Sequence, residues 1–142
     1  MRPENENRIG KRSVVIGTMD FAVIQALGRR FTSTKYDVRF IQKGVDIITE
    51  ILDHDVDMLI LDLELAGIMG AELLPVIRKL RPRLPIILIT DDYTGRIRQL
   101  AAEQRITYQT FKPMSDSNTD AILIATEKTI QKALELHTNS AV

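Results

Sequence analysis

The sequence predicts an α/β fold, a doubly wound five-stranded parallel sheet with helices on both faces. Short apolar runs alternate five times with stretches of helical period, which is the pattern of consecutive β/α units. The third and fourth runs are apolar almost throughout, as strands buried on both faces of a parallel sheet are. The length of 142 residues fits one domain with a sizeable core.

The first two β/α units show clear strand and helix periodicity. "SVVIGT" (13–18) is rich in β-branched residues and predicts a strand. Asp20 follows it, where a helix cap would lie, ahead of an apolar helical stripe (Val23, Ile24, Leu27 and Phe31). "YDVRFI" (36–41) alternates as a strand does, and Gly44 then breaks the chain. The second helix carries its apolar face at Ile47, Ile48, Ile51 and Leu52.

The third unit begins with "DMLILD" (57–62), which we interpret as the central strand. Gly67 and Gly70 predict a loop after it. A third helix follows, with apolar residues at Leu73, Leu74, Ile77 and Leu80. "RPRLP" ends this helix, because proline cannot continue the backbone hydrogen bonds. The charged stretch "RKLRPR" (78–83) is interpreted as a solvated helix end.

The last two units are shorter or weaker. "IILIT" (86–90) predicts a buried strand, and a fainter helical stripe follows it (Ile97, Leu100 and Ala101). "YQTF" (108–111) predicts the fifth strand. The last helix is expected to start near Thr119–Asp120 and to end near His137, with Leu123, Ile130 and Leu134 on one side.

Composition narrows the functional classes. Nineteen basic residues balance nineteen acidic ones, so general attraction to nucleic acid or to an anionic membrane is not indicated. The chain has no cysteine, which excludes disulfides and cysteine-based sites, and no apolar run of the length that a membrane helix needs. We expect tails at 1–12 and 138–142, one domain over 13–137, and a cytoplasmic location.

Four polar residues are expected at strand ends, where ligands bind in open parallel sheets: Asp20, Asp62, Thr90 and Lys112. Together they suit phosphoryl transfer to a carboxylate. Asp62 would be the nucleophile, and Asp20 with Asp62 would hold Mg²⁺, a hard cation that prefers carboxylate oxygens. Thr90 would donate its hydroxyl to a phosphoryl oxygen, and Lys112 would supply positive charge.

These residues lie in a pattern that resembles a known family. "LILDLELAGIMGAELL", "IILIT" and "FKP", with "YDVRFIQKGVDIITEIL" before them, resemble the CheY-like receiver domain of bacterial two-component response regulators. The resemblance runs from about Ser13 to His137. It implies a flavodoxin-like (βα)5 fold with strand order 2-1-3-4-5.

The resemblance also implies roles and partners. Asp62 would accept a phosphoryl group from a sensor histidine kinase or a phosphotransfer protein, and Glu64 would give a backbone carbonyl to the metal. Thr90 and Lys112 match the family's hydroxyl and lysine. The domain would signal to a downstream protein by contact and would not be an enzyme in its own right. No direct nucleic-acid or membrane partner is expected, and homodimerisation is left open.

The sequence departs from that family at four places. The usual pair of acids after the first strand is degenerate. The helical stripe favours the alignment that puts Met19 and Asp20 at the pair, and a rival alignment puts Gly17 and Thr18 there. Losing a carboxylate should weaken Mg²⁺ binding. Asp91 follows Thr90 where a small residue is usual, and would either crowd the entry or act as a substitute metal ligand. The other departures are Gln109 in place of an aromatic residue, beside Tyr108, and Ala66 in place of a proline.

Two alternatives to a phosphoacceptor follow from the sequence. The degenerate acidic pair, Asp91 and Gln109 favour an atypical receiver that acts as a phosphorylation-independent protein-interaction module. A phosphatase with an aspartyl nucleophile is disfavoured, because the "DLEL" stretch lies on the third strand and no cap domain fits in the chain. A dinucleotide-binding protein is disfavoured too, because no Gly-x-Gly-x-x-Gly follows the first strand.

Overall fold

The computed structural model describes residues 10–65, 70–91 and 95–140. Its five strands form one parallel sheet in the order β2-β1-β3-β4-β5, which confirms the predicted fold class. The strands are β1 (Arg12–Gly17), β2 (Tyr36–Ile41), β3 (Met58–Asp62), β4 (Ile86–Thr90) and β5 (Tyr108–Phe111). The helices are α2 (Phe21–Arg30), α3 (Gly44–Asp53), α4 (Gly70–Leu80), α5 (Gly95–Glu103) and α6 (Asp116–Ser140).

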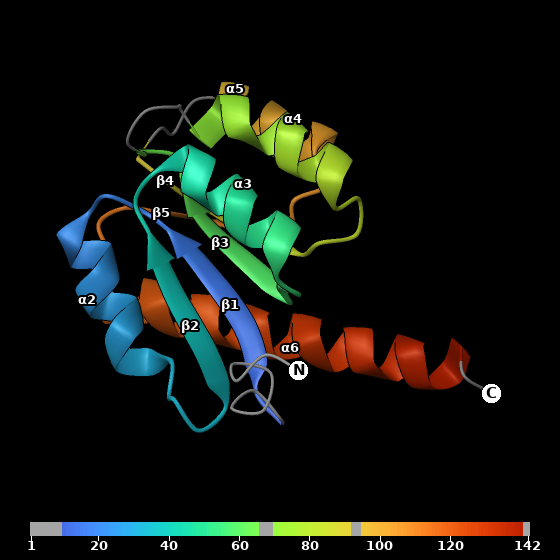
Figure 1. Cartoon of the computed structure of the whole chain (residues 1–142). Helices are drawn as coiled ribbons and strands as arrows, with labels where there is room; N and C mark the ends of the chain where they lie inside the picture. The colour runs from blue at the N-terminus through green and yellow to red at the C-terminus, as the bar shows by residue number, and fades with distance from the viewer. Residues whose placement is uncertain (1–9, 66–69, 92–94, 141–142) are drawn as a thin grey trace.

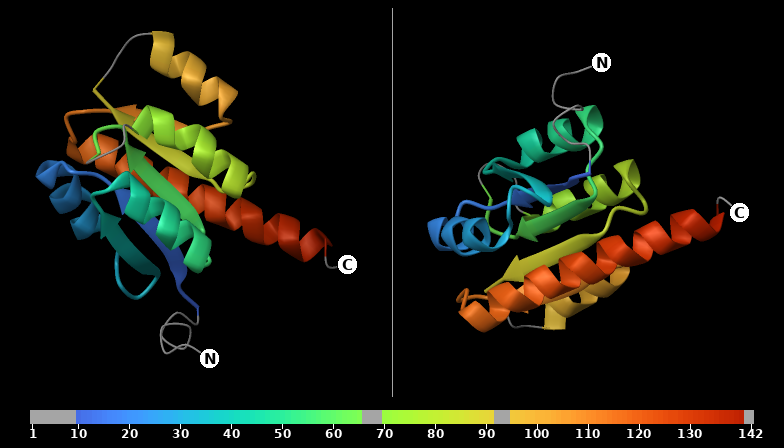
Figure 2. Two further views of the ribbon diagram at one scale, coloured as in Figure 1. Left: turned by 45° about the horizontal axis from the view of Figure 1, so that its top comes forward. Right: turned by 90° about the horizontal axis from the view of Figure 1, so that it is seen from below.

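Helices cover both faces of the sheet (Figures 1 and 2). On one face, α3, α4 and α5 pack on alternate strand residues such as Leu59 and Leu61. On the other face, α2 and α6 pack on the residues between them, Met58 and Ile60. Because β3 contributes to both clusters, its residues are buried throughout, as its apolar sequence predicts.

The bounds of α4 and α6 differ from the sequence-based expectations, and those of β1 and β3 differ by one residue. Gly70 was expected in a loop but begins α4, where its N–H donates to the carbonyl of Leu63 at 3.1 Å. Helix α6 begins at Asp116, earlier than expected, because the side chain of Asn118 bonds the carbonyls of Phe111 and Pro113 and so ties the first turn to the end of β5. The same helix continues to Ser140. Residues 1–9 and 141–142 of the expected tails lie outside the described residues, as does Gly67.

The charged stretch 78–83 is not simply a solvated helix end. Arg78 is 9% exposed, and its guanidinium donates to four backbone carbonyls, those of Leu84, Gln104, Pro82 and Arg81, at 2.7 to 3.3 Å. The arginine therefore joins the end of α4 to the following loop and to the end of α5. The expectation was wrong because it considered charge alone, whereas a planar guanidinium can satisfy several carbonyls at once.

Within the described residues, no helix combines the length and the apolar character that crossing a membrane requires.

Candidate functional site

The carboxyl ends of the strands bring the predicted residues to one edge of the sheet. Asp62 is the last residue of β3 and Thr90 the last residue of β4. Lys112 follows β5 directly, and its backbone N–H donates to the carbonyl of Thr90 at 2.9 Å. Asp20 lies just before α2, in the turn that leaves β1. The strand order places β3 between β1 and β4, so Asp62 sits at the centre of this edge.

Lys112 is the centre of a cluster of carboxylates. Its Nζ lies 2.8 Å from Asp62 Oδ2, 3.1 Å from Asp20 Oδ2 and 3.3 Å from Glu64 Oε2. The lysine side chain is 12% exposed, whereas that of Glu64 is 61% exposed. The contacts with Asp62 and Asp20 are therefore the ones that solvent screens least.

Asp62 is buried but fully hydrogen-bonded. It is 1% exposed. Its Oδ1 accepts from the backbone N–H of Glu64 at 3.0 Å. Its Oδ2 accepts from the hydroxyl of Thr18 at 2.7 Å as well as from Lys112. A carboxylate with these donors can stay at the end of an apolar strand without being an unpaired buried charge.

Contacts within the cluster shift the pKa values of Lys112 and Asp20 in opposite directions. Burial on its own would lower the pKa of Lys112, but hydrogen bonds to Asp62 and Asp20 outweigh it and raise that pKa above its ordinary value. The hydrogen bond from Lys112 lowers the pKa of Asp20, against a smaller opposing effect of burial. Both groups are therefore charged at neutral pH.

The structure resolves which residue of the first loop lies beside Asp62. Met19 is 52% exposed, whereas Thr18 is fully buried and contacts Asp62. This placement goes against the preferred alignment of Met19 and Asp20 and favours the rival alignment, which puts Gly17 and Thr18 at the positions of the acidic pair. Asp20 caps α2 through a 2.9 Å bond to Ala22 N, yet its other oxygen reaches Lys112. The side chain of Asp20 therefore caps α2 and contacts Lys112 at the same time.

Thr90 and Asp91 border a hollow next to the cluster. Thr90 is 2% exposed, and together with Glu64, Asp91 and Arg96 it lines a hollow of about 630 Å³ that reaches α5. Asp91 is exposed at its rim. The polar part of its lining therefore consists of hydroxyl, carboxylate, amide and guanidinium groups, beside apolar residues of α5.

Gln109 and Tyr108 lie side by side in β5, and Gln109 occupies the position at which an aromatic residue was expected from the family resemblance. Tyr108 is 36% exposed on β5. Gln109 faces the other way, and within the described part of the chain its buried Oε1 has no hydrogen-bond partner. Ala66 lies outside the described residues.

The carboxylates of the site are the type of ligand that binds a hard cation. Asp20 and Asp62 present carboxylate oxygens to one point, the chemistry that Mg²⁺ prefers. That point is where the Lys112 ammonium lies. Among residues 10–65, 70–91 and 95–140, no group of three His, Cys, Asp or Glu side chains is arranged as a metal site. A cation would therefore meet these carboxylates in competition with Lys112.

Sequence reasoning missed Thr18 as a site residue. The signal available was its position, since a short hydroxyl residue directly after an apolar strand can turn back onto the neighbouring strand end. The direction of the hydroxyl depends on the turn into α2, where Thr18 Oγ1 also accepts from Asp20 N at 2.9 Å. That turn cannot be read from apolar periodicity.

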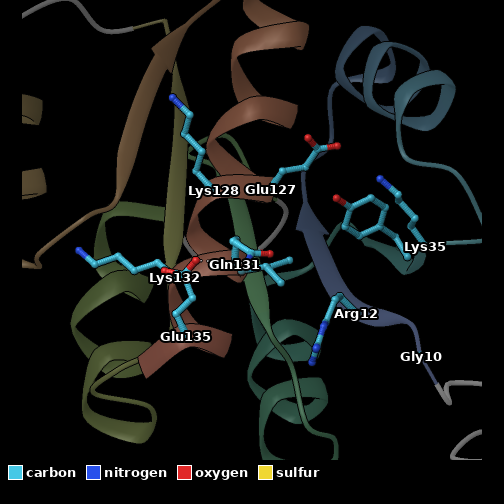
Figure 3. Close-up of a pocket in the computed structure, with 10 residues that line it drawn as sticks. Gly10, Arg12, Lys35, Glu127, Lys128, Gln131, Lys132 and Glu135 are labelled. Atoms are coloured by element: carbon cyan, nitrogen blue, oxygen red, sulfur yellow. Dashed lines mark hydrogen bonds between the residues drawn. The ribbon is translucent and has the colours of Figure 1, made fainter. Parts of the chain in front are cut away.

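A second hollow, of about 820 Å³, lies between α6 and the starts of β1 and β2 (Figure 3). Arg12, Lys35, Lys128 and Lys132 line it, but the two α6 lysines extend away from Arg12 and Lys35. None of the predicted site residues lines this hollow. Its cations do not converge on a single point, so volume alone does not make it the functional site.

Comparisons with known proteins agree with the geometry. A family model for the response regulator receiver domain matches residues 19–124. No curated protein matches the sequence.

Several solved structures share the fold. The signal receiver domain of an HD domain-containing protein from Pseudomonas fluorescens Pf-5 has 20% identity and a TM-score of 0.75, covering 86% of this chain and 96% of its own. The non-phosphorylated HemR receiver domain from Leptospira biflexa has 22% identity and a TM-score of 0.74, with coverages of 84% and 94%. The chemotaxis response regulator CheY4 of Vibrio cholerae has 16% identity and a TM-score of 0.71, with coverages of 82% and 98%.

Proposed function

The chain belongs to the response regulator receiver domain family, and from that membership we propose that Asp62 accepts a phosphoryl group in a His–Asp phosphorelay. The donor would be a sensor histidine kinase or a phosphotransfer protein. The phosphorylated domain would then signal by contact with a downstream protein. The observation that carries the proposal is the 2.8 Å contact between Lys112 Nζ and Asp62 Oδ2 at the carboxyl edge of the sheet.

The transfer step balances without a further reactant. A carboxylate oxygen of Asp62 attacks the phosphorus of a phosphohistidine, an O–P bond forms and the P–N bond breaks. The imidazole nitrogen leaves with the electron pair and is protonated by solvent. The result is an acyl phosphate on Asp62 and a neutral histidine on the donor.

The chain's own groups support this step. The ammonium of Lys112 would offset the charge on the phosphoryl oxygens, because it is already held at the carboxylate that gains the group. Thr90, buried at the end of β4, would donate its hydroxyl to one of those oxygens. Asp20, Asp62 and the backbone carbonyl of Glu64 would hold Mg²⁺. When bound, the ion would reduce repulsion between the carboxylate and the incoming phosphoryl group.

The test is an amide NMR titration of the full chain with beryllofluoride, a phosphoryl mimic, in the presence of millimolar Mg²⁺. We expect shifts around Asp62, Thr90 and Lys112 that are absent in Asp62→Asn. Asp57→Asn, a change at the other end of β3, is the matched control and should still respond, since Asp57 bonds the backbone of Ser13 and lies outside the cluster. A flat wild-type response would reject the phosphoacceptor and favour the phosphorylation-independent interaction module.

A further inference from the structure

The last residue of β1 is a glycine, which packs closely against two core side chains and carries no acid. Gly17 pairs with Leu61 in the sheet. A Cβ placed on Gly17 would lie 2.5 Å from Ile47 Cδ1 and 3.1 Å from Leu61 Cδ1. Ile47 and Leu61 are both fully buried. A side chain at position 17 would require the tip of the Ile47 side chain to shift, and Gly17 itself supplies no metal ligand.

The next residue takes part in the site through a neutral group. Thr18 is fully buried, and its hydroxyl has both a donor and an acceptor role. It donates to Asp62 Oδ2 at 2.7 Å and accepts from the backbone N–H of Asp20 at 2.9 Å. The side chain therefore fixes Asp62 relative to the turn that starts α2. It brings no negative charge with which to attract a cation.

The carboxylate oxygens of Asp62 and Asp20 already accept from the chain's own donors. Asp62 Oδ1 accepts from Glu64 N, and Asp62 Oδ2 accepts from Thr18 and Lys112. Asp20 Oδ1 caps α2 and its Oδ2 contacts Lys112. A divalent cation that binds both acids must remove the ammonium of Lys112 from between them. It gains no third carboxylate from Gly17 or Thr18 in return.

We propose that Thr18 is a positioning residue that stands where a metal-binding carboxylate would otherwise be and that, together with Lys112, fixes the side chain of Asp62. Thr18 and Lys112 thereby set a low affinity of the site for divalent cations. The inference rests on the proposed function, because it concerns the same carboxylate. Mg²⁺ and the Lys112 ammonium are competitors for Asp20 and Asp62. The substitution Thr18→Asp supplies the missing anionic oxygen and converts the site to tighter metal binding.

The experiment measures metal affinity directly, without a phosphodonor. The full chain is titrated with Mg²⁺ by calorimetry and with Mn²⁺ by paramagnetic broadening of amide signals. Thr18→Asp should lower the dissociation constant at least about tenfold. Lys112→Met should lower it too, because the competing cation is removed. Thr18→Ser retains the hydroxyl and should keep the wild-type affinity.

A spectroscopic readout separates positioning from a structural role. The carboxyl ¹³C signal of Asp62 should move in Thr18→Val, which removes the hydroxyl at nearly constant volume, and return to the wild-type position in Thr18→Ser. A mere packing role would leave the signal unchanged in both variants. If Thr18→Asp does not fold, Lys112→Met carries the affinity test alone.

Two results would overturn the inference: equal Mg²⁺ affinities in wild type and Thr18→Asp, or no gain in Lys112→Met. These are distinct from failure of the phosphoacceptor proposal. A silent beryllofluoride titration with tighter metal binding in Thr18→Asp rejects the proposed function and keeps the inference. A wild-type beryllofluoride response with unchanged affinities in the variants does the reverse.

Discussion

The ammonium of Lys112 lies 3.1 Å from Asp20 Oδ2, and this contact lowers the pKa of Asp20 below its ordinary value of 3.8. Ionised Asp20 therefore stabilises the folded state at and above the ordinary pKa, and this contribution is lost as the pH falls through the lower folded-state pKa. Asp20→Asn keeps a competent helix cap but removes the charge. We expect it to unfold more easily than wild type at pH 7, by up to about 1 kcal/mol.

The measurement is urea unfolding at a series of pH values from 7 to 2.5. The difference in stability between the two proteins should narrow as the pH falls, because Asp20 becomes protonated and loses its contact with Lys112 as an ion pair. In a Lys112→Met background the same substitution should change the pH profile less, because only the backbone hydrogen bonds at the helix cap then lower the pKa of Asp20. A gap that stays constant across the whole pH series would mean that the charge of Asp20 is not its cause.

Arg78 gives the second prediction, because its buried guanidinium serves four carbonyls. Arg78→Met keeps much of the apolar stem but leaves those carbonyls without their donor. We expect a loss of about 2–4 kcal/mol in the free energy of unfolding, measured by urea denaturation. Arg83→Met, at an exposed position of the same loop, is the matched control and should change stability by less than about 0.5 kcal/mol. Similar losses in the two variants would contradict the assignment.

Gln109 gives a prediction in the opposite direction. Its Oε1 is buried and, among the described residues, unpaired, so the folded state carries the cost of desolvating it. Gln109→Leu should stabilise the protein by about 1 kcal/mol. Gln42→Leu, at an exposed position after β2, should give no such gain. Thermal unfolding followed by circular dichroism would decide, and a lower midpoint for Gln109→Leu would show that the amide has a partner in solution.

Gly70 gives the fourth prediction, because it packs against the backbone beside Asp62. A Cβ at this position would lie 2.7 Å from Leu63 Cα, an atom that cannot move aside as a flexible side chain can. Gly70→Ala should cost about 1–3 kcal/mol of stability and shift the amide signals of residues 62–64. Gly95→Ala, at the start of α5, meets no described atom within 4 Å and should fold as wild type does. Unchanged amide signals at 62–64 in Gly70→Ala would reject the close contact.

The sheet and the helices could be predicted because apolar periodicity records which face of each element is buried. The strands at 36–41, 86–90 and 108–111 were predicted to the residue. The meeting of Asp62 with Lys112 followed from the same reasoning, since parallel strands end at one edge.

The features that were missed depend on turns and on loop carbonyls. Thr18 reaches Asp62 only because of the turn that follows β1, and Arg78 is buried because loop carbonyls surround its guanidinium. Neither arrangement has a repeating pattern in the sequence. Hydrophobic periodicity reports which side of an element faces the core, but not where a polar side chain finds its partners.

The cluster around Lys112 also has a consequence for how the molecule assembles. Thr18 and Asp62 are 44 residues apart, and Lys112 and Glu64 are 48 residues apart. Closing loops of this length costs chain entropy that a single helix does not have to meet. These contacts can therefore form only after β1, β3 and β5 have docked into one sheet. A partly folded intermediate therefore lacks the cluster, and the cluster is present only in the fully folded chain.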